Sequence, residues 1–193
     1  MANLSDNSQP SSDRWWSQLA PYQRLVFVVA TLAWLFDCLD QQLFNLARSP
    51  AMNSLLGDQQ TINLFGSFPI AAGALATSIF VVGWATGGMI FGSLGDRFGR
   101  AKMLSVTVLL YSIATGLSAL STSFTDFAVY RFITGLGVGG VFGLAVALVA
   151  DTVPGHIRPR ALGVLQSFSA VGNCAAGFIG LAIALTTIGA HPT

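Results

Sequence analysis

Five apolar runs, each about as long as a membrane-spanning helix, dominate this sequence. A helix needs about 20 mostly apolar residues to cross the hydrocarbon core of a bilayer. The runs cover residues 25–47, 70–94, 103–120, 127–150 and 161–187. Together they take up more than half of the 193 residues, which leaves no room for a separate soluble domain. We therefore predict an all-α polytopic membrane protein, with a polar tail over 1–23 and a bundle of five transmembrane helices over 24–193.

Charged side chains are too scarce to cover the surface of a soluble protein. They make up 9% of the residues, against about a quarter in ordinary soluble domains, while 53% of the residues are hydrophobic. The hydrophobic share excludes a disordered chain, and a net charge of +1 offers nucleic acid no basic surface. Two Cys and two His are too few for a zinc cluster. We expect the lipid bilayer as a partner, no nucleic acid, and neither a metal nor another cofactor.

The basic residues predict which way the helices cross the membrane. If the N-terminus lies inside the cell, seven of them fall on the cytoplasmic side: Arg14, Arg24, Arg97, Arg100, Lys102, Arg158 and Arg160. Arg48 then lies in an outer loop, and Arg131 lies within a span. Basic residues concentrate in the cytoplasmic loops of membrane proteins. We therefore expect a multi-pass protein of the cell (plasma or inner) membrane with a cytoplasmic N-terminal tail.

Small residues recur at four-residue spacing inside the spans. The clearest case is Gly135, Gly139 and Gly143 in the fourth run. This spacing puts the glycines on one helix face, where a neighbouring backbone can approach closely. We expect these glycines to pack helices together. The pattern suits helices that slide past each other, but tight packing in a static bundle explains it as well.

Three charged residues lie inside the spans, where a charge is costly and usually functional. Asp37 and Asp40 are three residues apart in the first run, and Gln41 continues the same helix face. Arg131 lies in the fourth run. Counted along the helices, Asp40 and Arg131 lie about 10 Å and about 6 Å below the same membrane boundary. We therefore predict an Asp40–Arg131 pair, with Asp37 deeper and freer to titrate.

These charges fit a proton-coupled path for a solute. If a conformational change moved Arg131 away, the freed carboxylate would favour protonation, and proton binding would follow the movement of the helices. The alternative is a static buried pair that only fixes helix packing.

The loop between the second and third runs carries the most specific motif. Its sequence holds Gly92, Leu94, Asp96, Arg97, Gly99, Arg100, Lys102 and Leu104 in a fixed order. This string resembles the signature loop of the major facilitator superfamily, G-x-L-a-D-r-x-G-R-k-x-x-l. Arg131 with the glycines that follow resembles the R-x-x-x-G-x-G-x-G motif of the same family. The formal G-x-G-x-x-G in that stretch lacks the preceding strand of a dinucleotide fold, and we reject that interpretation.

The resemblance implies an architecture of twelve helices in two six-helix halves, each built from inverted repeats. The five runs would form an incomplete N-terminal six-helix bundle. The chain would then be a fragment, or a truncated product, of a carrier whose C-terminal half is missing. The resemblance also implies that Asp151 meets Arg100, while Asp96 faces the other half. With Gly92, Arg97 and Gly99, these residues would form a cytoplasmic gate.

The resemblance predicts a secondary transporter that works by alternating access, and not an enzyme. The fifth run lacks the G-x-x-x-G-P-x-x-G-G string of proton antiporters. The string from Phe36 to Asp40 is more similar to family members that import acids or sugars. We therefore expect a symporter for a small polar solute such as an organic acid or a sugar. The alternative is a non-transporting truncated or split subunit that packs with a partner.

Overall fold

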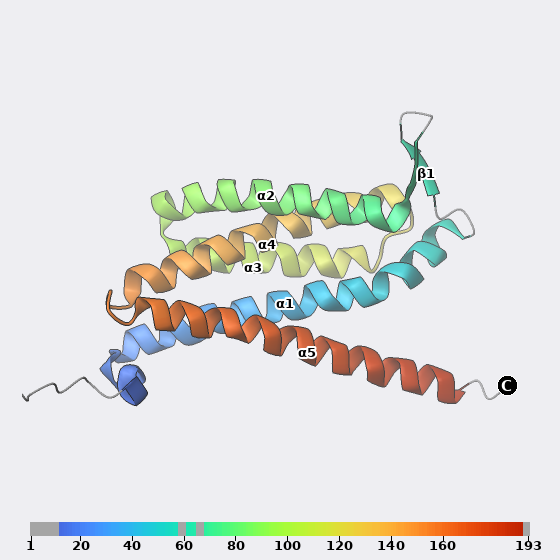
Figure 1. The fold of residues 1–193 in the computed structure, drawn as a ribbon. Coiled ribbons are helices and arrows are strands. Elements are labelled where there is room, and N and C mark those ends of the chain that lie inside the picture. Colours follow the sequence, from blue (N-terminus) through green and yellow to red (C-terminus); the bar gives the residue numbers. More distant parts are fainter. Residues whose placement is uncertain (1–11, 58–60, 65–67, 191–193) are drawn as a thin grey trace, which may run out of the picture.

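Five long helices lie side by side and account for most of the structure, a computed structural model that describes residues 12–57, 61–64 and 68–190 (Figure 1). The helices are α1 (Pro21–Leu56), α2 (Ala72–Phe98), α3 (Arg100–Ser118), α4 (Phe124–Thr152) and α5 (Arg158–Ala190). Within the described residues, these five helices are long and apolar enough to cross a membrane. Each contains one of the five predicted runs, or most of it.

The helix α4 occupies the centre of the bundle and is its most buried element. It packs against α2 most extensively, then against α3 and α1. Val138, Val141 and Leu144 of α4 are almost completely inaccessible and form the middle of the core. The helix begins after Ser123, whose hydroxyl accepts a hydrogen bond from the Asp126 amide at 3.2 Å. Such a cap satisfies one of the free amides at a helix start, and α4 therefore begins three residues before the predicted run.

Glycines bring the backbones of α2 and α4 into direct contact. A Cβ atom at Gly135 would collide with the Phe80 carbonyl of α2, and one at Gly139 would collide with the Trp84 carbonyl. The same holds in reverse, because a Cβ at Gly83 or Gly87 of α2 would meet the backbone of α4. Backbone atoms cannot move aside as a flexible side chain can, so only glycine fits at these four positions. We name them the glycine seam.

Gly143 lies outside the glycine seam, although its spacing grouped it with Gly135 and Gly139. A Cβ at Gly143 would meet no atom within 4 Å among the described residues. One residue further along, the Leu144 side chain rather than a glycine contacts α2, at Gly95. The two backbones are thus already separated by a side chain at this level.

The first helix is longer than its apolar run. It continues past residue 47, through Pro50, and ends at Leu56. Met52 in this extension is 4% exposed and packs in a small cluster with Ala72 and Ala76 of α2 and Phe127 of α4. This packing explains why the helix continues beyond the run. Arg48, expected in an outer loop, is therefore a helical residue.

Two shorter elements lie at the ends of the bundle. The strands β1 (Thr61–Leu64) and β2 (Phe68–Ala71) pair antiparallel and project beyond α1 and α2, an addition to the all-α prediction (Figure 1). At the other end, residues Ser12–Gln18 of the polar tail form a 3-10 helix. Residues 1–11 of the tail lie outside the described residues.

The helix α5 lies on α1 and diverges from it toward the C-terminal end (Figure 1). The closest approach is at Gly172, where a Cβ atom would meet the Leu35 carbonyl and the Cys38 side chain of α1. Most described side chains in the second half of α5 are exposed. In this structure, α5 therefore depends mainly on α1 for its position.

The glycine seam predicts a position-specific effect on stability. We expect Gly139→Val to lower the free energy of unfolding by about 1–3 kcal/mol, because the added side chain forces α2 and α4 apart. Thermal unfolding of the purified protein in detergent measures this effect. Gly143→Val, four residues along the same helix, is the matched control and is expected to have little effect. Equal losses at the two positions would contradict the seam.

Candidate functional site

A small polar cavity between α1, α2 and α4 brings together three of the four residues predicted for the solute path. Asp40, Gln41 and Arg131 line it, together with the Asn45 and Thr77 side chains. Its volume is about 160 Å³. Phe44 of α1 and Phe80 and Val81 of α2 complete its wall, so the polar groups meet in an otherwise apolar environment. We name this space the α2-side cavity.

Arg131 is buried, with 3% of its surface exposed. Its Nη2 donates a hydrogen bond to the Ser118 hydroxyl of α3 at 3.2 Å. Its guanidinium carbon lies 4.1 Å from the centroid of the Phe44 ring and 5.6 Å from that of Phe127. Its Nε is buried and has no hydrogen-bond partner among the described residues. The cation is thus held by a hydroxyl and by aromatic ring faces, and its Nε–H remains available to donate a hydrogen bond.

Asp40 and Arg131 are close, as predicted, but they do not form the predicted ion pair. The ion pairs of 4.0 Å or less among the described residues lie elsewhere. Asp40 Oδ2 instead accepts a hydrogen bond from the Thr115 hydroxyl at 3.4 Å. Counting residues along the helices predicts that the two charges lie at a similar depth. It cannot predict that hydroxyl groups of α3 bind them.

A second cavity lies on the other side of the same two charges. Asp40 and Arg131 also line this space of about 250 Å³, with Thr115 and Ser118 of α3 in its wall. Phe44 lines both cavities as well. We name it the α3-side cavity. Asp40, Phe44 and Arg131 therefore form a partition between two spaces.

Asp37 is completely buried and lines neither cavity. One carboxylate oxygen accepts a hydrogen bond from the Gln41 side chain at 3.2 Å, and the other has no partner among the described residues. Tyr111 of α3 lies close enough to interact electrostatically with both Asp37 and Asp40. Asp37 is thus set back from the cavities, and Gln41, which lines the α2-side cavity, donates to it.

Several residues around the cavities were not singled out from the sequence. Arg48 Nη1 donates a hydrogen bond to the Thr77 hydroxyl at 3.1 Å, and Thr77 lines the α2-side cavity. Thr115 and Ser118 hold Asp40 and Arg131. Single hydroxyl groups are common in transmembrane helices and carry no distinctive pattern. The only available signal was the three-residue spacing of Thr115 and Ser118, which places them on one face of α3.

A charged cluster joins three helices at the opposite end of the bundle. Arg100, the first residue of α3, forms ion pairs with Asp96 of α2, at 3.0 Å, and with Asp151 of α4. Its Nη1 also donates to the Ala147 carbonyl of α4 at 2.9 Å. The pair of Arg100 and Asp151 is therefore present. Asp96 binds Arg100 as well, so within the described residues it is part of the same cluster.

Gly99 allows the sharp turn that places Arg100 in this cluster. Its φ angle is +95°, a backbone conformation that residues other than glycine rarely adopt. Gly99 both ends α2 and precedes α3, so a single residue reverses the chain direction. Gly92 faces open space, and Arg97 is exposed. Neither residue contacts the cluster in this conformation.

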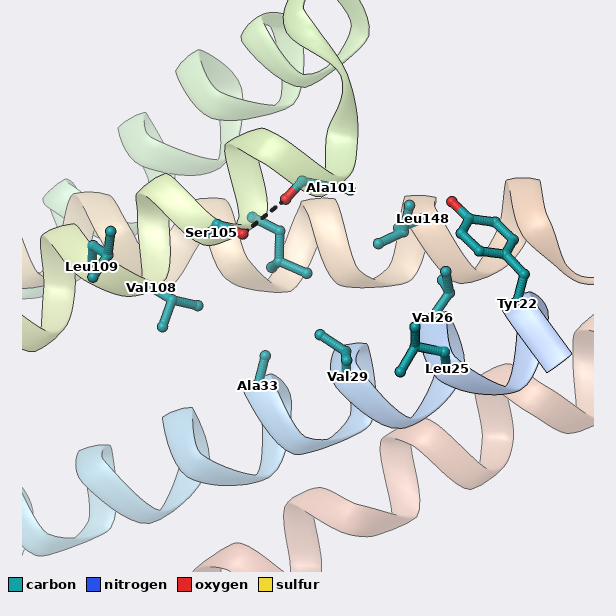
Figure 2. Close-up of a pocket in the computed structure, with 11 residues that line it drawn as sticks. Tyr22, Leu25, Val26, Val29, Ala33, Ala101, Ser105, Val108, Leu109 and Leu148 are labelled. Atoms are coloured by element: carbon teal, nitrogen blue, oxygen red, sulfur yellow. Dashed lines mark hydrogen bonds between the residues drawn. The ribbon is translucent and has the colours of Figure 1, made fainter.

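A further cavity is an apolar groove and not a site for a polar solute. It has a volume of about 610 Å³ and lies between α1 and α3, with Leu148 of α4 in its wall (Figure 2). The Tyr22 and Ser105 hydroxyls are its polar side-chain groups, and Ser105 donates to the Ala101 carbonyl at 3.2 Å. No cluster of three metal-ligating side chains occurs among the described residues. The α2-side and α3-side cavities are therefore the candidate site.

Comparisons with known proteins point to one family. The sequence model of the Major Facilitator Superfamily matches residues 30–192. The niacin transporter NiaP of Acinetobacter baylyi is 36% identical over 155 residues, which are 80% of this chain and 33% of that protein. The benzoate transport protein of the same organism is 30% identical over 169 residues, 85% of this chain and 34% of that protein.

A solved structure is similar to most of the chain. The crystal structure of a bacterial homologue of the human lysosomal transporter Spinster, inward-facing and unoccupied, has a TM-score of 0.71 at 25% identity. The similarity covers 84% of this chain and 32% of that one. The chain thus spans about a third of the length of the curated relatives described above.

The Arg100 cluster predicts unequal effects for two neighbouring arginines. We expect Arg100→Ala to lower the free energy of unfolding by about 1–3 kcal/mol, because it removes two ion pairs and a charge-assisted bond to a carbonyl. Arg97→Ala, an exposed arginine of the same loop, is the control and is expected to change stability by less than about 0.5 kcal/mol. Thermal unfolding in detergent distinguishes them. A larger loss for Arg97→Ala would contradict the role of the cluster.

Proposed function

The chain belongs to the major facilitator superfamily, and on that premise we propose that it forms the first five helices of a secondary transporter for a small organic acid. The matched relatives are named as transporters and not as enzymes. Their coverage supports a carrier about three times as long, which suits the first five of twelve helices. A non-transporting truncated or split subunit is the alternative.

The single observation that carries the solute class is the state of Arg131. A buried guanidinium with an unused Nε–H, at the edge of a polar cavity, suits a carboxylate, which accepts charge-assisted hydrogen bonds. The Phe44 ring beside it offers an apolar face for the rest of the solute. Niacin and benzoate, the solutes in the names of the two relatives, are aromatic carboxylates. A neutral sugar would leave the positive charge of Arg131 without a matching group.

We propose that transport is coupled to protons through Asp40 and Asp37. Both lie within α1 at membrane depth, where the charged form of a carboxylate is costly. Asp40 faces the cavities and interacts electrostatically with Arg131. An anionic solute that binds Arg131 neutralises the positive charge that stabilises the Asp40 carboxylate. Protonation of Asp40 then becomes more favourable. Asp37 would then pass the proton on or hold it.

The Arg100 cluster is proposed as a gate at the cytoplasmic side. It joins α2, α3 and α4 at one end, whereas the candidate site lies toward the other end. We further propose a cytoplasmic N-terminus in the cell membrane, because seven basic residues then lie inside. Alternating access would break the cluster when the inner side opens.

The experiment measures uptake of radiolabelled benzoate by proteoliposomes that contain the full-length carrier, with and without an inward proton gradient. We expect the gradient to increase uptake at least tenfold in the unmutated protein. In D40N this increase should disappear, because an amide cannot accept the proton. D126N, which changes an exposed carboxylate at the start of α4, is the matched control. Undiminished coupling in D40N would remove Asp40 from the mechanism, and a lack of any uptake by the unmutated protein would contradict the proposed function.

A further inference from the structure

Two hydroxyl groups on α3 hold the two opposite charges of the candidate site. Ser118 Oγ accepts from Arg131 Nη2 at 3.2 Å, and Thr115 Oγ1 donates to Asp40 Oδ2 at 3.4 Å. Thr115 and Ser118 are three residues apart, and both line the α3-side cavity. One face of α3 thus contacts both charges.

The direction of each hydrogen bond matches the charge that the hydroxyl holds. Ser118 donates its own proton to the Ala114 carbonyl at 2.9 Å, so its lone pairs remain for the cation. Thr115 donates its proton to the anion. An acceptor therefore meets the positive charge and a donor meets the negative charge. If Ser118 acted as the donor and Thr115 as the acceptor, neither hydrogen bond could form.

We propose that Thr115 and Ser118 are positioning residues that keep Asp40 and Arg131 from forming an ion pair. The proposal rests on the proposed proton coupling through Asp40. By satisfying each charge separately, α3 leaves Arg131 available for a carboxylate and leaves Asp40 able to exchange a proton. A direct ion pair would block both, because each partner would neutralise the other.

Few charged or titratable groups surround the buried Asp40, and Arg131 is the strongest of them in its effect on Asp40. Asp37 and Cys38 lie on α1, and Tyr111 lies on α3. The residues of α2 that line the α2-side cavity do not titrate, and the exposed Cys174 is the titratable residue in the middle of α5. Arg131 is therefore the positive charge near Asp40 among the described residues at this depth. Among the charged neighbours of Asp40, Arg131 is therefore the one whose distance changes the protonation of this buried carboxyl most.

The experiment follows the infrared band of the protonated Asp40 carboxyl group against pH, in the full-length protein reconstituted in lipid. The D37N background removes the neighbouring carboxyl, and the band that D40N abolishes belongs to Asp40. In Ser118→Ala, Arg131 loses its acceptor and moves onto Asp40. We expect the midpoint of the titration to fall by about one pH unit, the size of effect that a new opposite charge produces. Thr115→Val removes a hydrogen bond that favours the charged carboxylate, which alone would raise the midpoint. We expect the midpoint to fall in this variant as well, because Arg131 then takes the place of the hydroxyl on Asp40.

Two further variants make the result decisive. Ser118→Thr keeps a hydroxyl and should restore the original midpoint. Ser105→Ala is the matched control, since Ser105 donates to a carbonyl of its own helix as Ser118 does but lies in the apolar groove. An unchanged midpoint in Ser118→Ala, a midpoint that stays or rises in Thr115→Val, or an equal shift in Ser105→Ala would overturn the proposal. If Ser118→Ala does not accumulate, Thr115→Val decides. The titration does not depend on transport. A failure of benzoate uptake, which would contradict the proposed function, is therefore distinguishable from an absent shift in the midpoint, which would contradict the role of Thr115 and Ser118.

Discussion

Direct backbone contact between α2 and α4 is the constraint on which the rest of the structure depends. Apolar side chains gain little from meeting each other in lipid, so close packing must hold transmembrane helices together. The glycine seam provides this packing and fixes α4 in the centre of the bundle. The two ends of α4 then place Arg131 beside α1 and α3, and Asp151 beside Arg100. Both charged centres are thus attached to one rigid helix.

The two centres differ in how their charges are satisfied. At the Arg100 end, partly exposed ion pairs join three helices and can break at little cost, because water solvates the separated charges. At the other end, Arg131 is buried on Phe44 and bonded to Ser118, while Asp40 is held by Thr115. An anionic solute can therefore bind Arg131 without first breaking an ion pair. This difference suits a gate at one end and a binding site at the other.

The family and the helical membrane fold were predictable from the sequence because their signals are local. The turn at Gly99 needs a positive φ, and the charges around it have fixed spacings, so the loop is recognisable in one dimension. The partner of Arg131 was not predictable, since spacing along a helix gives depth but not the direction of a side chain toward a third helix. The extension of α1 past Pro50 depends on the burial of Met52, a tertiary contact without a local signal.

The central claim is that the charges within the spans couple an organic acid to a proton. The most direct test adds benzoate to proteoliposomes of the full-length carrier in a weakly buffered medium, with no gradient imposed, and follows the external pH. If the acid anion and a proton enter together, the medium becomes more alkaline as benzoate is taken up, and Arg131→Ala abolishes the change. Uptake of benzoate without any proton movement would contradict the account.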